Sequence, residues 1–505
     1  MFFCASQKMN RYFAIAVMRI NMKAIRQGIK MNYRATFSLL SIWIFFSVFV
    51  PVQAEEPAVS HQESLRGSIT PERAWWDLRH YQLDLTVDIA NQHFSGTNII
   101  TYQVIGEAKT LQLELQPPMK IDAVQAGGKP LKVKQDGYSY FISLMEEQIV
   151  GKEYQIDVQF SGNPHAAKNA PWDGGITWSE DSGGMPFVAS SNQGIGASIW
   201  WPNKDHGYDE PDNGIVMNVT VPRPFVNVSN GRLIHVEDVE EGSSRTYTWQ
   251  VKSPINNYGI NINIADYVEF SEQYKGEGGT LDMDYYVLRE NEEKAKTQFE
   301  DAKRTIEAME HWFGQYPFYQ DSFKLVEAPY LGMEHQSSVT YGNGYQNGYK
   351  GEDLSGTGWG LKWDFIIIHE IAHEWFANSV TAQDVADLWI HEGFTTYAEG
   401  LFVEYFYGKS AGDEYIRGLR KNINNDKPLI GIYNANLIGS YDIYPKGANL
   451  LHTIRQLVAD DKAWRELLRG ISETFFHQTI TTQQLEKYMT EQTGLTLSSV
   501  FNQYL

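Results

Sequence analysis

The hydrophobic pattern of this chain changes its period once, near Ser271, and this change limits the possible folds more than any other feature. Before it, apolar and polar residues alternate, as they do in residues 81–89, 154–160 and 217–221. Such alternation is typical of strands with one buried face, and the turns rich in Gly, Pro and Asn favour antiparallel sheets. We therefore predict an N-terminal β-domain, a saddle-shaped sheet or a sandwich, over residues 68–268.

Between residues 169 and 213 the alternation fails. This stretch is rich in glycine and contains Trp172, Trp178, Trp200 and Trp201. A long aromatic connection inside a compact domain is often functional, although a loop packed on the next domain would have the same composition. We expect a long connection here.

After Ser271 the apolar residues recur every three or four positions, which is the pattern of an amphipathic helix. The clearest example is the set Phe299, Ala302, Ile306, Met309 and Phe313, which Gly314 and Pro317 close. Further helices are expected over residues 363–380, 392–407 and 445–460. The sequence thus predicts an α+β multidomain protein with a mainly helical domain over residues 269–505.

The first 54 residues differ from the rest in charge and composition. They hold seven Lys or Arg residues and no acid, and an apolar run over residues 35–50 leads to Val52-Gln53-Ala54. This order is typical of an export signal, so we expect cleavage after Ala54, a linker at 55–67, and a periplasmic or extracellular protein. A membrane anchor is the alternative, but the run is shorter than the roughly 20 residues that span a bilayer. We expect no stable membrane span after cleavage.

Charge and cysteine content exclude two classes of function. The chain has 42 Lys and Arg against 62 Asp and Glu, a formal net charge of −20, which disfavours nucleic acid as a partner. The single cysteine, Cys4, precedes the apolar run. The exported chain is therefore expected to have neither a disulfide nor thiol chemistry.

The segment from His369 to His373 contains candidate metal ligands and a candidate base. On a helix, residues four apart lie on one face, so both imidazoles can reach one ion, and Glu370 flanks the metal position. The preceding apolar run, residues 365–368, predicts burial, and buried imidazoles beside a carboxylate need partners. Glu392 begins the next expected helix. Two histidines and a glutamate are the three protein ligands of a catalytic zinc site.

A zinc ion at this point would acidify a water molecule, and Glu370 is placed to accept the proton. Glu399 lies two helical turns after Glu392. It is a candidate for holding one ligand histidine, and a solvated surface glutamate is the other interpretation.

These residues resemble the gluzincin aminopeptidases, the aminopeptidase N family. The resemblance is carried by His369-Glu370-x-x-His373 and by Glu392 within residues 389–394, and it extends from about Arg66 to Leu505. It implies a thermolysin-like catalytic domain with one Zn²⁺ per chain. It also implies an aminopeptidase that acts on peptide substrates with a free N-terminus.

Gly332-Met333-Glu334 is similar to the core of the exopeptidase motif of this family. The resemblance implies that Glu334 binds the α-amino group of the substrate and that Gly332 and Met333 also bind the substrate. A carboxylate at a fixed distance from the metal favours a cation at the first residue only. Leu331 and His335 stand where the family usually has Gly and Asn. These two departures affect the backbone contacts that the family motif makes near the scissile bond.

Two further residues take roles from the same resemblance. Tyr444, in Tyr444-Pro445-Lys446-Gly447, is implied to hydrogen-bond the oxyanion of the tetrahedral intermediate, with Tyr441 as the fallback. Gln193, nine residues before Pro202, is implied to help hold the amino end of the substrate. Since Gln193 belongs to the β-domain, the site is expected where the two domains meet.

Many members of the family continue into a large helical domain beyond the point at which this sequence stops. An open cleft is therefore expected, and a zinc metalloendopeptidase is the alternative enzyme. A non-catalytic peptide-binding protein is the alternative of another class, although such proteins commonly lose a ligand or the base. Hydrolysis of a non-peptide substrate such as an epoxide is a third possibility within the family.

Overall fold

The computed structural model describes residues 59–108 and 110–505, and the segment Val59–Leu505 forms one compact unit. The predicted export signal, residues 1–54, lies outside the described residues. Part of the predicted linker forms helix α2 (His61–Gly67), because Ser60 and Glu63 make a reciprocal capping box at its start.

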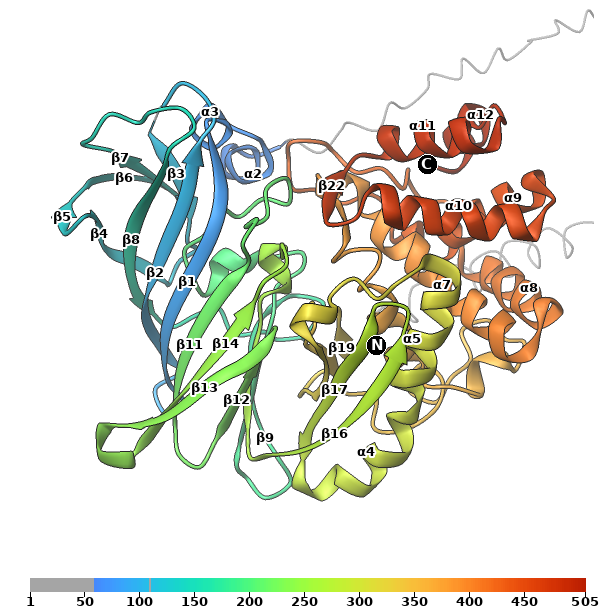
Figure 1. Ribbon diagram of the computed structural model, residues 1–505, viewed down its shortest axis with the longest axis horizontal. Coiled ribbons are helices and arrows are strands. Elements are labelled where there is room, and N and C mark those ends of the chain that lie inside the picture. The colour runs from blue at the N-terminus through green and yellow to red at the C-terminus, as the bar shows by residue number, and fades with distance from the viewer. Residues whose placement is uncertain (1–58, 109) are drawn as a thin grey trace, which may run out of the picture. The chain divides into compact units, whose positions relative to one another are not determined.

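Three sheets build the N-terminal domain (Figure 1). The largest has eight strands in the order β13 (Arg232–Val239), β14 (Ser244–Val251), β11 (Ile215–Pro222), β1 (Trp76–Asp88), β2 (His93–Val104), β8 (Glu153–Gly162), β4 (Lys120–Ala126) and β5 (Lys129–Pro130). The others have the orders β3 (Leu111–Glu114), β7 (Ser139–Ser143), β6 (Lys132–Asp136) and β12 (Val226–Ser229), β15 (Ile262–Ala265), β10 (Pro186–Ser191), β9 (Gly175–Glu180). The predicted β-domain is confirmed.

One strand pair departs from the predicted antiparallel arrangement. β1 and β11 are parallel, with Leu83 opposite Met217, whereas the other pairs of this sheet are antiparallel. Parallel neighbours need a long crossover, and more than a hundred residues separate the two strands. Both strands still bury alternate residues against a core that includes Leu85 and Val219.

The stretch expected to be a long connection, residues 169–213, contains two strands, β9 and β10. Five of the six residues of β10 are buried, so the strand has no alternating pattern by which the sequence would reveal it. Trp200 and Trp201 are fully buried in the core of the β-domain, whereas the side chain of Trp172 is 56% exposed.

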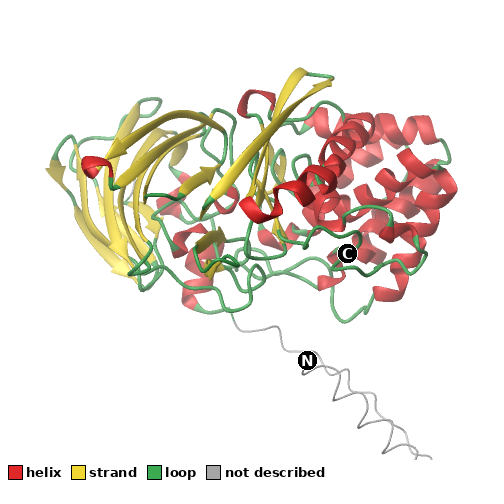
Figure 2. Cartoon of the chain, turned by 90° about the horizontal axis from the view of Figure 1, so that it is seen from below, coloured by secondary structure: helices red, strands yellow, loops and turns green. Residues whose placement is uncertain are grey.

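The second domain begins with a five-stranded sheet, next to the predicted boundary at 268–269. Its order is β16 (Tyr267–Gly276), β17 (Gly279–Leu288), β18 (Phe323–Glu327), β20 (Val339–Tyr341), β19 (Gly332–Met333), and β21 (Val380–Ala382) pairs with β22 (Gln478–Ile480). Figures 1 and 2 show this sheet between the β-domain and the helices. As the edge strand, β19 has one side without a strand partner.

More residues of the second domain lie in helices than in strands, which confirms the predicted α+β architecture. They are α4 (Glu292–Gln298), α5 (Glu300–Phe313), α6 (Phe365–Ala372), α7 (Trp389–Tyr407), α8 (Lys409–Gly418), α9 (Pro445–Val458), α10 (Asp461–Thr474), α11 (Thr482–Thr493) and α12 (Ser498–Tyr504), and α3 (Pro71–Ala74) precedes β1. Trp312, Trp363 and Trp389 lie in their shared core. None of the described helices combines the length and apolar character that crossing a bilayer requires.

Candidate metal centre

The first two candidate ligands come from α6 and its end. The expected helix over residues 363–380 stops at Ala372, and His373 caps it. Beyond it, the amides of Asn378, Ser379 and Val380 donate to carbonyls five residues earlier, a wider turn than that of an α-helix. This turn brings the carbonyl oxygen of Phe376 to 2.9 Å from Nδ1 of His373, which an uninterrupted helix would not do.

Glu392, in the first turn of α7, supplies the third candidate ligand. Its Oε2 atom lies 3.5 Å from Nε2 of His369 and 3.4 Å from Nε2 of His373. A tetrahedral zinc ion with ligands at about 2.1 Å holds neighbouring donor atoms about 3.4 Å apart, so the three atoms fit one ion. Glu392 Oε2 has no hydrogen-bond partner among the described residues, which leaves its lone pairs for a metal.

Hydrogen bonds behind the two imidazoles aim their Nε2 atoms at the metal position. Nδ1 of His369 lies 2.7 Å from Oε1 of Glu399, and the Tyr415 hydroxyl donates to the other oxygen of this carboxylate at 2.7 Å. Nδ1 of His373 donates to the Phe376 carbonyl and lies 3.0 Å from Oγ1 of Thr395. Such partners fix the tautomer and raise the basicity of metal-bound histidines.

Three buried carboxylates surround this point. Glu334, Glu370 and Glu392 are at most 8% exposed. Burial raises the pKa of Glu370 to about 7, and the neighbouring Glu334 carboxylate adds to the rise. Burial also raises the pKa of Glu334, where Glu392 contributes in the same direction. Buried acids in this number require a cation, which a divalent metal supplies.

The metal position lies on the wall of a cleft of about 510 Å³ that Glu370 also lines. Edge strand β19 forms one wall, and Gly332 lets it approach α6 closely. A Cβ atom at this position would lie 2.5 Å from Cγ2 of Ile366 and 3.2 Å from Cγ of Glu370. Met333 and Leu331 line the same wall. The predicted contact residues Gly332 and Met333 therefore lie in the cleft.

Two side chains of the β-domain hydrogen-bond acids at the cleft. Nε2 of Gln193 donates to Oε1 of Glu334 at 2.6 Å and to Oε1 of Glu392 at 3.2 Å. The hydroxyl of Tyr258, in the turn Asn257–Gly259, also hydrogen-bonds the Glu334 side chain and lies 3.5 Å from Nδ1 of His391. Sequence reasoning did not identify Tyr258, because no periodicity or motif distinguishes it from other turn tyrosines.

Tyr444 stands where α9 begins, with Pro445 as the first residue of the helix. The helix can approach α7 because Gly447 faces Gly393: a Cβ atom on Gly447 would lie 2.8 Å from the Cα atom of Gly393. As a result, the Tyr444 ring stacks on His369 with centroids 6.0 Å apart. Burial and the nearby Glu392 carboxylate raise the pKa of Tyr444 well above its ordinary value, so its hydroxyl stays protonated.

Tyr441 and His335, whose roles the sequence left open, lie in different parts of the structure. Tyr441, the fallback for Tyr444, lines the outer part of the cleft and is 70% exposed. His335, which stands where the family usually has Asn, is fully buried and does not line the cleft. Its ring lies 3.2 Å from the Thr340 hydroxyl, and its backbone amide donates to the Met333 carbonyl.

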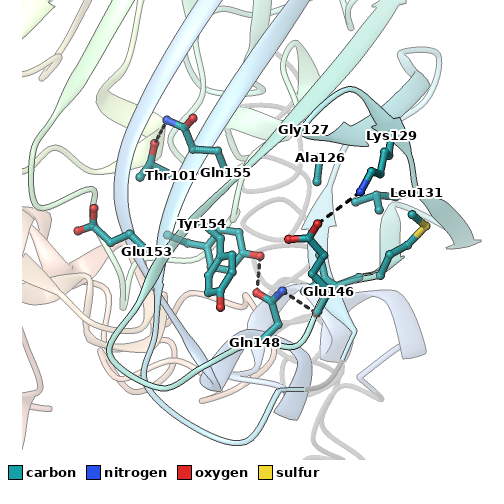
Figure 3. Close-up of a pocket in the computed structure, with 13 residues that line it drawn as sticks. Thr101, Ala126, Gly127, Lys129, Leu131, Glu146, Gln148, Glu153, Tyr154 and Gln155 are labelled. Carbon is teal, nitrogen blue, oxygen red and sulfur yellow. Dashed lines mark hydrogen bonds and ion pairs between the residues drawn. The ribbon is translucent and has the colours of Figure 1, made fainter.

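The β-domain contains a separate hollow of about 470 Å³ beside β2, β4 and β8 (Figure 3). Several polar side chains in it are paired with one another. Lys129 contacts Glu146, and Gln148 accepts a hydrogen bond from Tyr102. It contains none of the candidate metal ligands. The chemistry of the described residues therefore centres on the cleft.

Known families match both domains. The Peptidase M1 N-terminal domain matches residues 78–258, and the Peptidase family M1 domain matches residues 297–504. A tricorn protease-interacting factor, F2 of Thermoplasma acidophilum, is 23% identical over 78% of this chain and 48% of its own length. Mouse endoplasmic reticulum aminopeptidase 1 is 21% identical over 86% of this chain and 49% of its own length. The chain thus spans about half the length of these curated relatives.

Solved structures share the fold. A crystal structure of an M1 zinc metallopeptidase from Deinococcus radiodurans, bound to a Tyr-Ser-Ala substrate, superimposes with a TM-score of 0.70. The two chains are 21% identical, and the match covers 86% of this chain and 94% of the other. Another crystal structure of an M1 zinc metallopeptidase from Deinococcus radiodurans gives a TM-score of 0.69 over the same shares of the two chains.

The hydrogen bond behind His369 gives a test of the metal site. We predict that Glu399→Gln lowers the affinity for zinc about 10- to 100-fold, because it removes the negative charge that polarises the imidazole. Competition with a chromophoric chelator measures this affinity. Glu404→Gln, on the same helix but paired with Arg455, is the matched control and should leave the zinc affinity unchanged. Equal affinities for Glu399→Gln and the wild type would contradict the assigned orientation of His369.

Proposed function

Because the chain belongs to peptidase family M1, we propose that it is a zinc-dependent aminopeptidase that removes the first residue from peptides with a free amino terminus. The observation that carries this proposal is the pair Glu334 and Gln193, which are hydrogen-bonded to each other beside the metal position. A buried carboxylate there favours a cationic amino group over an uncharged backbone.

One zinc ion per chain is proposed, held by His369, His373 and Glu392. Bound zinc is a Lewis acid that polarises a carbonyl group and acidifies water. The distances among the three donor atoms and the hydrogen bonds behind both histidines support this ligand set.

Glu370 is proposed as the general base. It projects into the cleft one residue after His369, and burial raises its pKa to about 7, near the value that suits a base at neutral pH. It takes a proton from the attacking water and passes it to the amine of the departing peptide. Gly332 keeps β19 close to Glu370, so a peptide that lies along this strand is held beside the base.

Tyr444 is proposed to stabilise the oxyanion that forms on the scissile carbonyl. Its hydroxyl stays protonated, and its ring lies on the cleft side of His369. A hydrogen-bond donor placed before the charge develops lowers the barrier without reorganisation. Tyr441 is less suited to this role, since its side chain is largely exposed.

Gln193 and Tyr258 both hydrogen-bond the Glu334 carboxylate beside the metal position. A carboxylate held in this way favours a terminal ammonium group over the uncharged backbone of a continuing chain, which argues against a metalloendopeptidase. All three candidate ligands and the base are present, which argues against a non-catalytic binding protein.

Export is a separate proposal, which rests on the basic and apolar order of residues 1–54 and on the Val52-Gln53-Ala54 cleavage pattern. We predict that the protein recovered from the periplasm or the medium begins at Glu55, because a signal peptidase would cut after Ala54. N-terminal sequencing of the recovered protein tests this. A protein that retains residues before Ala54 and stays in the membrane fraction would contradict it.

The role of Glu334 predicts a strict requirement for a free amine. A fluorogenic aminoacyl amide should be hydrolysed, and its N-acetylated twin should not. Glu334→Gln is expected to lower kcat/KM for the free amine about 100-fold, since it leaves the ammonium group without a charged partner. Steady-state kinetics at neutral pH gives both comparisons.

The matched control for this experiment is Glu310→Gln. Glu310 is also a buried glutamate that accepts hydrogen bonds, but it lies outside the cleft. It should leave kcat/KM unchanged. Similar hydrolysis of the free and acetylated compounds would overturn the assignment as an aminopeptidase.

A further inference from the structure

A second hollow, of about 470 Å³, adjoins the metal cleft on the side away from Glu334. The two share Trp172 and Leu331 as lining residues, so they lie next to each other. The hollow is formed mainly by the segment that precedes β19 and by the loop around Lys350. It contains none of the residues proposed above to bind zinc or to act on the scissile bond.

The direction of a bound peptide follows from the structure around β19. With the amino group at Glu334, a peptide that pairs with the free edge of β19 as an added strand runs past Gly332 toward Leu331. This path leads from the metal position into the second hollow. The residues beyond the cleaved bond are the ones that reach it.

The hollow presents positive charge. Lys350 and Lys294 line it, and both side chains are exposed. The Lys350 ammonium lies 4.9 Å from the ring centroid of Trp172 and 5.7 Å from that of Tyr349, and both rings line the metal cleft. The Lys294 ammonium donates to the side-chain oxygen of Asn291 at 3.0 Å. In the part of the chain that the structure describes, neither lysine has a carboxylate at ion-pair distance.

The one acid of the hollow is already engaged. The carboxylate of Glu327 accepts hydrogen bonds from the Leu288 amide at 2.8 Å and from the Asn291 side chain at 2.7 Å. Its side chain is buried, and burial raises the pKa of Glu327 above its ordinary value. The lining residues therefore carry two lysine charges against one carboxylate, a net positive charge in a chain whose net charge is −20.

Trp172 offers an apolar surface at the junction of the two hollows. Its loop is held in place, because the Asp173 carboxylate accepts hydrogen bonds from the amides of Lys168 and Asn169 at 2.8 and 2.9 Å. An exposed tryptophan on an ordered loop gives a peptide a large contact area at a small loss of conformational entropy. This position explains why so large an aromatic residue remains exposed.

We propose that this hollow binds a carboxylate of the peptide substrate beyond the cleaved bond, with Lys350 as the principal cation and Lys294 as the second. The proposal rests on the proposed function, because it takes the amino end to lie at Glu334. The preferred substrates are then short peptides that carry a negative charge beyond the scissile bond. Two groups supply such a charge, the terminal carboxylate and an acidic side chain.

The test uses peptides of three to five residues in matched pairs, one with a free carboxyl terminus and one amidated. In the wild type, kcat/KM for the free acid should exceed that for the amide by about two- to fivefold at one length, the range expected of an exposed ion pair. In Lys350→Met this ratio should fall to near one. Because the ratio compares two substrates on one variant, a general loss of activity cancels.

Lys362→Met is the matched control, since the Lys362 ammonium also lies over a tryptophan, Trp359, at 4.7 Å, but lines neither hollow. It should retain the wild-type ratio. Amidated peptides with a glutamate at the third or fourth position separate the two sources of the carboxylate. If they regain the advantage of the free acid, an acidic side chain is bound; if not, the terminal carboxylate is bound.

Binding gives a readout that does not depend on turnover. In Glu370→Gln, the free acid should bind about two- to fivefold more tightly than the amide in calorimetry, by the same ion-pair estimate, and Lys350→Met should remove the difference. Equal ratios in the wild type and Lys350→Met would overturn the proposal. A failure of the proposed aminopeptidase function would give a different result from a failure of this proposal. The aminoacyl amide has no residue that reaches the hollow, so it would remain unhydrolysed only if the proposed function were wrong.

Discussion

Two imidazoles and one carboxylate from two helices converge at 3.4–3.5 Å on one side of the cleft, and the surrounding structure depends on this contact. α6 ends at Ala372 so that the following turn can orient His373, and α7 presents Glu392 and Glu399 two turns apart on one face. Buried acids and histidines at this density are stable only around a cation. The metal site is therefore a constraint on folding as well as on chemistry.

The β-domain completes the cleft. Gln193 links the Glu334 and Glu392 carboxylates, so one amide from the first domain touches both the metal site and the proposed amine site of the second. Tyr258 approaches Glu334 from the same domain. Any shift between the domains would alter the position of the amino group relative to the metal. In the proposed function, the cleft thus sets a fixed distance from the amino end of a peptide to its first bond.

The sequence predicted the parts of this arrangement that are local. The spacing of His369 and His373 specifies a shared helical face, and the change of period predicts the two domains. Glu334, Gln193 and Tyr444 were recognised only through the resemblance to a family, because their proximity depends on contacts between distant segments. Tyr258, the early end of α6 and the parallel pairing of β1 with β11 were not predicted, since tertiary packing determines all three.

The most direct test of the account is a crystal structure of the Glu370→Gln variant with zinc and an uncleaved tripeptide. The account predicts zinc bound by His369, His373 and Glu392, and the peptide amino group within hydrogen-bond distance of Glu334 and Gln193. It also predicts that the first carbonyl faces Tyr444. A peptide that extends past Glu334 in both directions, or a metal held by other residues, would contradict it.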